Sequence, residues 1–246
     1  MQRYQRSRPG VWRLLVALFI CGWYSALALP GALAVHQQSG YASGVVFHDR
    51  NRNGVRDTGE PGVPGVRVSN QRDVVVTDPE GRYRIPVGDD TILFVIKPRG
   101  WMTPTSDTRL PRFYYIHKPA GSPSHLRYPG VAPTGPLPAS VDFPLYPQRE
   151  PNRFRVLLFG DTQPRNQQEI DYIAHDVVEG LIGFKAAFGI TLGDILFDDL
   201  SLFDSLNRTI GLIGIPWYNV LGNHDMNFDA VDDRHSDETF ERHFGP

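Results

Sequence analysis

Short apolar runs separated by turn residues fill the stretch from Tyr41 to about Pro98. These runs are rich in β-branched and aromatic residues and recur roughly every ten residues along the chain. Short strands at such a spacing, separated by turn signals, are typical of an all-β sandwich. Runs at 41–47, 65–70, 73–77, 82–87 and 91–97 therefore predict a small all-β sandwich domain within residues 35–102.

The pattern changes at Arg153. RFRVLLFGD and AAFGITLGD are nearly continuous apolar runs of the kind buried on both faces of a parallel sheet. Between them, apolar residues recur with the helical period behind Asn166, a good N-cap. A second helical stretch, about 200–210, precedes a third run, PWYNVLGNHD. Strand, helix, strand, helix and strand predict an α/β domain over residues 153–246, with right-handed crossovers.

Residues 103–152 join these two regions and are rich in proline and glycine, as in HKPAGSPSHLRYPGVAPTGPLP. Proline lacks the amide donor that a strand ladder needs. We therefore expect a long connector that contains two short strands, around Phe113–Ile116 and Val141–Leu145.

The first 34 residues resemble no part of the rest. Four arginines precede the apolar stretch LLVALFICGWYSALAL, and small-residue triplets follow it. This order indicates a signal peptide over residues 1–34 and a secreted or periplasmic protein, without a membrane segment after cleavage. The alternative is an uncleaved anchor helix. Cys21, the only cysteine, falls in this segment, so no disulfide is expected in the mature chain.

The net charge of the chain argues against a nucleic acid polymer as its partner. Removal of residues 1–34 would change the formal net charge from −2 to −6, because the segment carries four arginines and no acid. An acidic chain is poorly suited to bind a nucleic acid polymer. Its oligomeric state is not indicated by the sequence.

A stretch of twelve residues, DRNRNGVRDTGE, follows the pattern of a calcium loop. Its sharp turn would fall at Gly54. The alternative is a solvated turn without metal, since Asn, Asp and Gly favour turns by themselves. The candidate calcium ligands are Asp49, Asn51, Asn53, Val55, Asp57 and Glu60.

Polar side chains follow each of the three apolar runs of the α/β region, and a glycine precedes each group. Carboxyl ends of neighbouring parallel strands line one crevice, so these side chains are expected to converge. Carboxylate, amide and imidazole groups suit Mn²⁺, Fe²⁺ or Zn²⁺. A shared aspartate would hold two such ions about 3.5–4 Å apart, as in two-metal hydrolases. The residues concerned are Asp161 and Gln163, then Asp194, then Asn223, His224 and Asp225.

The ordered motifs G-D-x-Q, G-D-x-x-x-D and G-N-H-D resemble those of the calcineurin-like metallophosphoesterase superfamily. The resemblance covers residues 153–246 and implies two divalent metals. It implies that Asp161 and Gln163 bind the first metal, that Asp194 bridges both, and that Asn223 binds the second. Residues 41–98 similarly resemble the small domain that precedes some members of this superfamily.

The resemblance also implies roles in the reaction. His224 would act as the acid or electrostatic stabiliser at the leaving group, oriented by Asp225. Glutamine stands at position 163, where most members have histidine, and a neutral amide should bind metal more weakly. Members supply further histidines after G-N-H-D. The printed chain reaches Pro246 without those motifs, so we expect an incomplete phosphoesterase domain, and His235 and His243 are poor substitutes.

These features give two hypotheses. The first is an exported, metal-dependent hydrolase of phosphate mono- or diesters of small molecules. The second is a catalytically silent surface or interaction protein built on a calcium-binding β-sandwich. Near the site, Asp198 is interpreted as structural or as a support for the metal ligands, and Arg165 as a solvated charge rather than a phosphate contact. His175 is expected on a helix surface.

Overall fold

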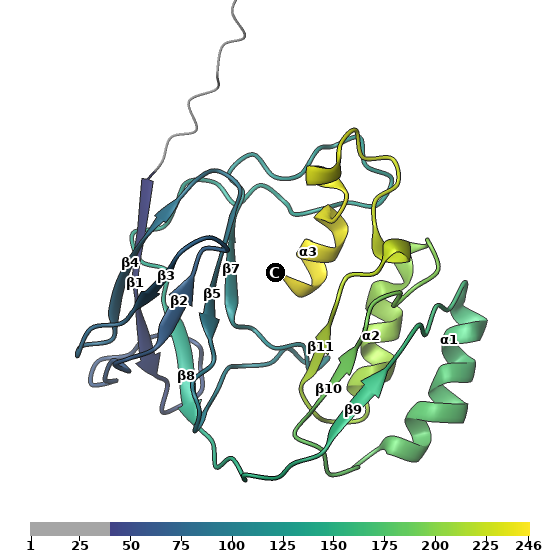
Figure 1. Ribbon diagram of the computed structural model, residues 1–246, viewed down its shortest axis with the longest axis horizontal. Coiled ribbons are helices and arrows are strands. Elements are labelled where there is room, and N and C mark those ends of the chain that lie inside the picture. Colours follow the sequence, from purple (N-terminus) through teal and green to yellow (C-terminus); the bar gives the residue numbers. More distant parts are fainter. Residues whose placement is uncertain (1–39) are drawn as a thin grey trace, which may run out of the picture. The chain divides into compact units, whose positions relative to one another are not determined.

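The computed structural model describes residues 40–246 (Figure 1). The predicted signal peptide and Cys21 lie outside this range. The described residues all belong to one compact unit. None of the helices within residues 40–246 has the length and apolar character needed to cross a membrane.

Eight short strands form two four-stranded sheets (Figure 1). In the first, with the order β4-β1-β8-β6, β1 pairs antiparallel with β4 and parallel with β8, and β8 pairs antiparallel with β6. In the second, with the order β3-β2-β5-β7, every pair is antiparallel. The first sheet comprises β1 (Gly40–His48), β4 (Arg82–Val87), β6 (Trp101–Met102) and β8 (Phe143–Pro147). The second comprises β2 (Arg67–Ser69), β3 (Val74–Val76), β5 (Thr91–Ile96) and β7 (Tyr114–His117).

Apolar and polar residues alternate in β4, and this alternation determines which face of the strand is buried. In β4 the apolar residues Tyr83, Ile85 and Val87 are buried, and the residues between them are exposed. Because side chains on a strand alternate between faces, every second residue reaches the core. The two sheets share one hydrophobic cluster, which includes Val46 and Leu145 from the first sheet and Leu93 and Val95 from the second.

The expected connector contributes to these sheets. Both strands predicted in it are found, as β7 and β8. β7 pairs with β5, and β8 lies between β1 and β6. This proline-rich stretch therefore supplies strands to the core and does not merely link two regions.

The region after Arg155 has the predicted order of strands and helices. Asn166 caps the first helix, and its side chain accepts a hydrogen bond from the backbone N–H of Glu169. The three strands are parallel, in the order β11-β10-β9. These elements are β9 (Val156–Phe159), α1 (Gln167–Ile173), β10 (Phe188–Thr191), α2 (Phe203–Gly211), β11 (Trp217–Asn219) and α3 (Glu238–Phe244). A π-helical turn (Ala174–Val178) and a 3-10 turn (Glu179–Leu181) extend α1, and other 3-10 turns cover Leu200–Leu202, Asn223–Asp225 and Asp233–His235.

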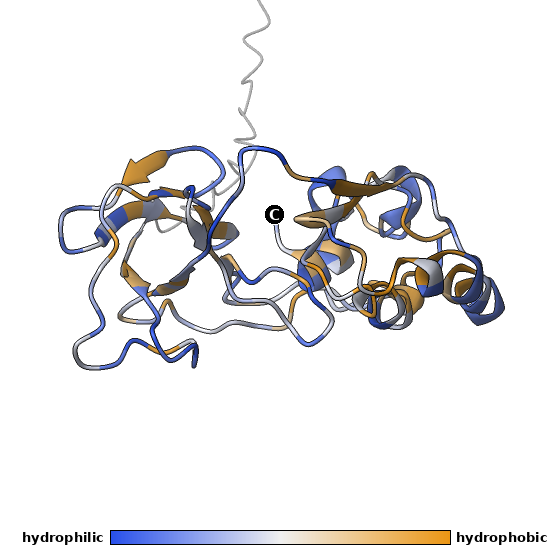
Figure 2. Ribbon diagram, turned by 90° about the horizontal axis from the view of Figure 1, so that it is seen from below, coloured by the Kyte–Doolittle hydropathy of each residue, from blue (hydrophilic) through white to orange (hydrophobic). Residues whose placement is uncertain are grey.

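The sequence predicted that both faces of this parallel sheet are buried, and this is correct for one face only. Trp217 is buried on the face that packs against the helices, where its ring contacts Phe159 with centroids 4.7 Å apart. The opposite face is open: Leu158 and Leu192 remain 60% and 55% exposed. Figure 2 shows the helices of this region on one side of its hydrophobic strands. Tyr218, on the same face, is half-buried and packs against Phe113 with ring centroids 6.2 Å apart. The prediction of burial on both faces was wrong for Leu158 and Leu192, because the described residues cover only part of the second face.

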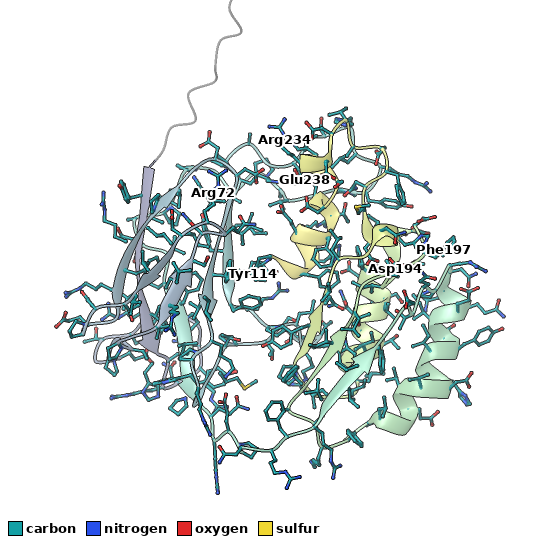
Figure 3. The ribbon with its side chains drawn as sticks, in the orientation of Figure 1. Arg72, Tyr114, Asp194, Phe197, Arg234 and Glu238 are labelled. Carbon is teal, nitrogen blue, oxygen red and sulfur yellow. The ribbon has the colours of Figure 1, made fainter. Side chains whose placement is uncertain are left out.

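A buried charged cluster holds α3. Nζ of Lys118 lies 2.5 Å from Oε2 of Glu238, 3.3 Å from Glu241 and 3.0 Å from Asp90. Burial alone would lower the pKa of Lys118, but these carboxylates outweigh it and raise the pKa. Figure 3 labels Glu238 on α3. The cluster ties the segment after β7 to this helix through charge as well as apolar packing.

Candidate metal centre

The ends of the three parallel strands meet, as the sequence predicted. Nε2 of Gln163, after β9, donates to Oδ2 of Asp194, after β10, at 2.8 Å. The backbone N–H of His224, after β11, donates to Oδ1 of the same aspartate at 3.2 Å. Asp194 is therefore the point at which all three strand ends join, and Figure 3 labels it at this edge of the sheet.

Asp161 and Asn223 lie close in sequence to the residues that form this junction. Asp161 stands two residues before Gln163, and Asn223 directly precedes His224. Both are exposed. Within residues 40–246 neither side chain has a hydrogen-bond partner. Within that range their oxygens are therefore not engaged in hydrogen bonds and are available to a cation.

Backbone strain is concentrated at this edge. Asp161, Gln163, Asp194 and Asp198 have φ values of 44°, 40°, 47° and 64°. Outside glycine, a left-handed conformation costs about 1–3 kcal/mol for each residue and tends to occur at functional sites. Seven non-glycine residues in the described part of the chain have positive φ, and four of them are these. The fold thus tolerates strain to place polar side chains at the ends of β9 and β10.

A close backbone approach requires Gly222. A Cβ atom at this position would lie 2.0 Å from the backbone nitrogen of Asp194 and 2.2 Å from its Oδ1. Atoms cannot approach so closely. Because glycine has no side chain, the end of β11 can approach Asp194 directly.

His224 is held by a carboxylate and by an aromatic ring. Its Nδ1 lies 2.7 Å from Oδ1 of Asp198, and its ring stacks on Phe197 with centroids 4.5 Å apart and planes 20° apart. The hydrogen bond to Asp198 raises the pKa of His224, and the nearby charges of Asp194 and Asp225 add to the effect. The imidazole is thereby fixed with Nδ1 toward Asp198, which leaves Nε2 to face a ligand.

The role expected of Asp225 is corrected by these contacts. Asp225 is fully buried, and its carboxylate accepts hydrogen bonds from the backbone N–H groups of Ile195, Leu196 and Gly222 at 3.1, 3.0 and 2.9 Å. Burial raises its pKa, and the three amides oppose that rise. Asp225 thus ties the end of β10 to the end of β11, and Asp198 orients His224 instead.

Two side chains that precede His224 in the chain, Asp198 and Phe197, contact its imidazole. Asp198 follows Asp194 by four residues, and the G-D-x-x-x-D spacing is the signal that could have identified it. Phe197 is half-buried, and its ring contacts His224. The guanidinium of Arg165 lies 4.7 Å from the centre of the Phe197 ring (Figure 3 labels Phe197).

The remaining histidines named from the sequence take part in other contacts. Nδ1 of His235 lies 2.6 Å from Asp232, and Nδ1 of His243, on α3, lies 3.3 Å from Asp204. His175 is 80% exposed, as predicted. Contacts between these three side chains and the strand-end residues are absent from the described part of the chain.

The donors at the strand ends suit a divalent cation through oxygen. Among residues 40–246 no group of three or more His, Cys, Asp or Glu side chains is arranged to hold a metal. The strand-end set is of a different kind, with two carboxylates and two amides contributed by Asp161, Asp194, Gln163 and Asn223. Carboxylate and amide oxygens favour Mg²⁺ or Mn²⁺ over soft metals.

The loop from Asp49 to Glu60 closes on itself. Oδ2 of Asp49 accepts a hydrogen bond from the backbone N–H of Gly54 at 2.9 Å. The two carboxylate oxygens of Glu60 accept hydrogen bonds from the backbone N–H groups of Arg50 and Asp57 at 2.7 and 3.0 Å. Asp49 and Glu60 are 1% and 7% exposed. The six candidate calcium ligands therefore lie on one compact turn, which is also the arrangement expected of a turn without metal.

The N-terminal part of the chain is similar to a known protein family. Residues 50–129 match the family described as the N terminal of Calcineurin-like phosphoesterase. The resemblance to calcineurin-like phosphoesterases is confirmed by this match. It includes β2 to β7 and extends into the proline-rich stretch.

Two other comparisons add little. A solved purple acid phosphatase, PPD1 from seeds of yellow lupin (Lupinus luteus), is 11% identical, covering 76% of this chain and 36% of its own, with a TM-score of 0.25. That score is too low to indicate a shared fold, and this chain spans about a third of the length of that protein. No curated protein matches.

Proposed function

We propose that this chain is part of an exported, metal-dependent phosphoesterase that hydrolyses phosphate mono- or diesters of small molecules. The observation that supports the proposal most directly is the junction of Gln163, Asp194 and His224, which come from three different strand ends. The same proposal divides the chain into a signal peptide (1–34), a β-sandwich domain (35–102), a connector (103–152) that also contributes β7 and β8 to the two sheets, and part of a phosphoesterase domain (153–246).

Each residue of the site has a distinct task in this proposal. Asp161, Gln163, Asp194 and Asn223 would hold two divalent transition metals, Mn, Fe or Zn. Such ions supply Lewis-acid activation of the ester and of water. His224, fixed by Asp198 at Nδ1, donates a proton from Nε2 to the departing alcohol oxygen. Asp225 keeps the strand ends that carry Asp194 and His224 at a fixed separation.

The direct test is hydrolysis of p-nitrophenyl phosphate and of bis(p-nitrophenyl) phosphate by the purified chain with Mn²⁺. We expect release of p-nitrophenol that stops with a chelator and returns with added Mn²⁺. A chain extended through any histidine motifs that follow Pro246 serves as the second sample. Metal-independent release, or no release from either protein, would contradict the proposal and favour the silent interaction protein.

We further propose that the loop from Asp49 to Glu60 binds Ca²⁺ in a structural role. In its support, oxygen-bearing residues occupy the spacing of a calcium loop, and its first and last carboxylates are buried. A calcium concentration about ten times the Kd should raise the Tm of the full chain by about 2–5 °C. The variant Glu60→Gln should lose this gain. Equal Tm with and without millimolar Ca²⁺ would leave only the metal-free turn.

A further inference from the structure

A cavity of about 780 Å³ lies at the opposite end of the parallel strands from Asp194. Its wall includes Arg155, directly before β9, Phe188, which begins β10, and Pro216, directly before β11. Strand residues extend about 3.3 Å each, so the four residues of β10 place this cavity more than about 10 Å from the carboxyl ends. It is therefore a different site from the candidate metal centre.

Positive charge dominates the wall of the cavity. Glu150 is the one acid among the residues that line it, and it is already paired with Lys97. The other five cations have no ion-pair partner within residues 40–246. In a chain whose net charge is negative, this local excess favours an anion. The cations are Lys97, Arg99, Arg149, Arg153, Arg155 and Lys185.

Aromatic rings supply the second part of the wall. The ring centroids of Phe154 and Phe188 are 6.1 Å apart, and those of Phe188 and Tyr218 are 5.8 Å apart with planes at 85°. Phe154 is 59% exposed, so its ring is accessible to a ligand. A planar apolar group can pack against such a row of rings.

We propose that this cavity binds a small organic phosphate with an aromatic body, of the size of a nucleoside monophosphate. A volume of about 780 Å³ lies within the range of small-molecule sites. The guanidinium groups match the oxygens of a phosphate two at a time, and the aromatic wall accommodates the ring. This proposal does not depend on the phosphoesterase proposal, because none of the metal-site residues lines the cavity.

The proposal is tested by isothermal titration calorimetry on the full chain in the presence of a chelator, which removes any contribution from divalent metals. Adenosine monophosphate, adenosine and inorganic phosphate are titrated separately. We expect the monophosphate to bind in the micromolar to millimolar range, at least about tenfold more tightly than either adenosine or phosphate alone.

Variants locate the binding. Replacement of Arg99 and Arg153 together by glutamine should weaken monophosphate binding by at least about tenfold, and Phe188→Leu should weaken it by several-fold. Arg234→Gln is the matched control: this arginine is 83% exposed on its side chain, pairs with Asp232 and does not line the cavity (Figure 3 labels Arg234). Asp194→Asn should leave the Kd unchanged.

Three outcomes would overturn the proposal. The first is that titration with the monophosphate up to about 10 mM produces no heat. The second is that adenosine and its monophosphate bind with equal affinity. The third is that the Kd for the monophosphate changes in Asp194→Asn but not in the double arginine variant. The last outcome would place the phosphate at the strand ends. Hydrolysis assays address the other site, so failure of either proposal leaves the other intact.

Discussion

Asp194→Asn is expected to reduce the manganese-dependent hydrolysis of p-nitrophenyl phosphate by about 10²–10³-fold. The Asp194 side chain contacts the ends of both neighbouring strands, through Gln163 and the backbone of His224. Removal of its charge would weaken the binding of any cation that it shares. Asparagine is the sharpest substitution because it keeps the shape and tolerates the left-handed backbone at φ 47°, so the fold should persist.

The experiment measures metal binding as well as activity. Calorimetric titration with Mn²⁺ should show loss of at least one binding event in the variant. Asp171→Asn on the exposed surface of α1 is the control and should leave both readings unchanged. An Asp194→Asn protein that retained full Mn²⁺ affinity and full activity would remove Asp194 from the metal centre.

Asp225→Ala is expected to lower the free energy of unfolding by about 3–5 kcal/mol. The substitution would leave three backbone N–H groups, of Ile195, Leu196 and Gly222, without their acceptor in a fully buried position. Denaturant unfolding followed by tryptophan fluorescence measures the loss, because Trp217 is buried in the core of the same region.

Asp198→Asn is the matched comparison, because both aspartates were candidates to orient His224. Asn should preserve the positive φ of 64°, and we expect little change in stability. Activity should fall by about 10–100-fold, since the imidazole loses the group that fixes it. Asp198 raises the pKa of His224 and keeps the acid form present at higher pH. Its neutralisation should therefore move the alkaline limb of the rate profile to lower pH.

The two variants together distinguish a structural from a catalytic aspartate. The contacts of the fold predict that Asp225→Ala mainly affects unfolding and that Asp198→Asn mainly affects the rate. A stable Asp225→Ala protein without activity, beside a fully active Asp198→Asn protein, would show that Asp225 orients His224, as predicted from the sequence.

Local patterns accounted for most of the secondary structure. The short β-rich runs between turn signals at residues 41–97 each became a strand, β1 to β5. Asn166 capped the first helix as expected, since capping depends on residues only three positions apart. The parallel direction of β9, β10 and β11 also followed from the alternation of strands and helices. These features depend on neighbours in the chain.

The partners of polar groups did not follow from local patterns. G-N-H-D places Asp225 beside His224 in the chain, but the short 3-10 turn there directs the carboxylate to the amides of Ile195 and Leu196. The partner of His224 is Asp198, 26 residues earlier. Similarly, the continuous apolar runs did not reveal that the second face of the parallel sheet is only partly covered, with Leu158 and Leu192 exposed.

By itself the sequence determined where strands and helices form and that polar residues follow three parallel strands, because hydrophobic period and strand direction are properties of short segments. Only the tertiary structure decided which aspartate orients the histidine and where unpaired cations meet aromatic rings. Those arrangements depend on the approach of backbone segments that are distant in the chain, as at Gly222 and Asp194, and no local pattern encodes that approach.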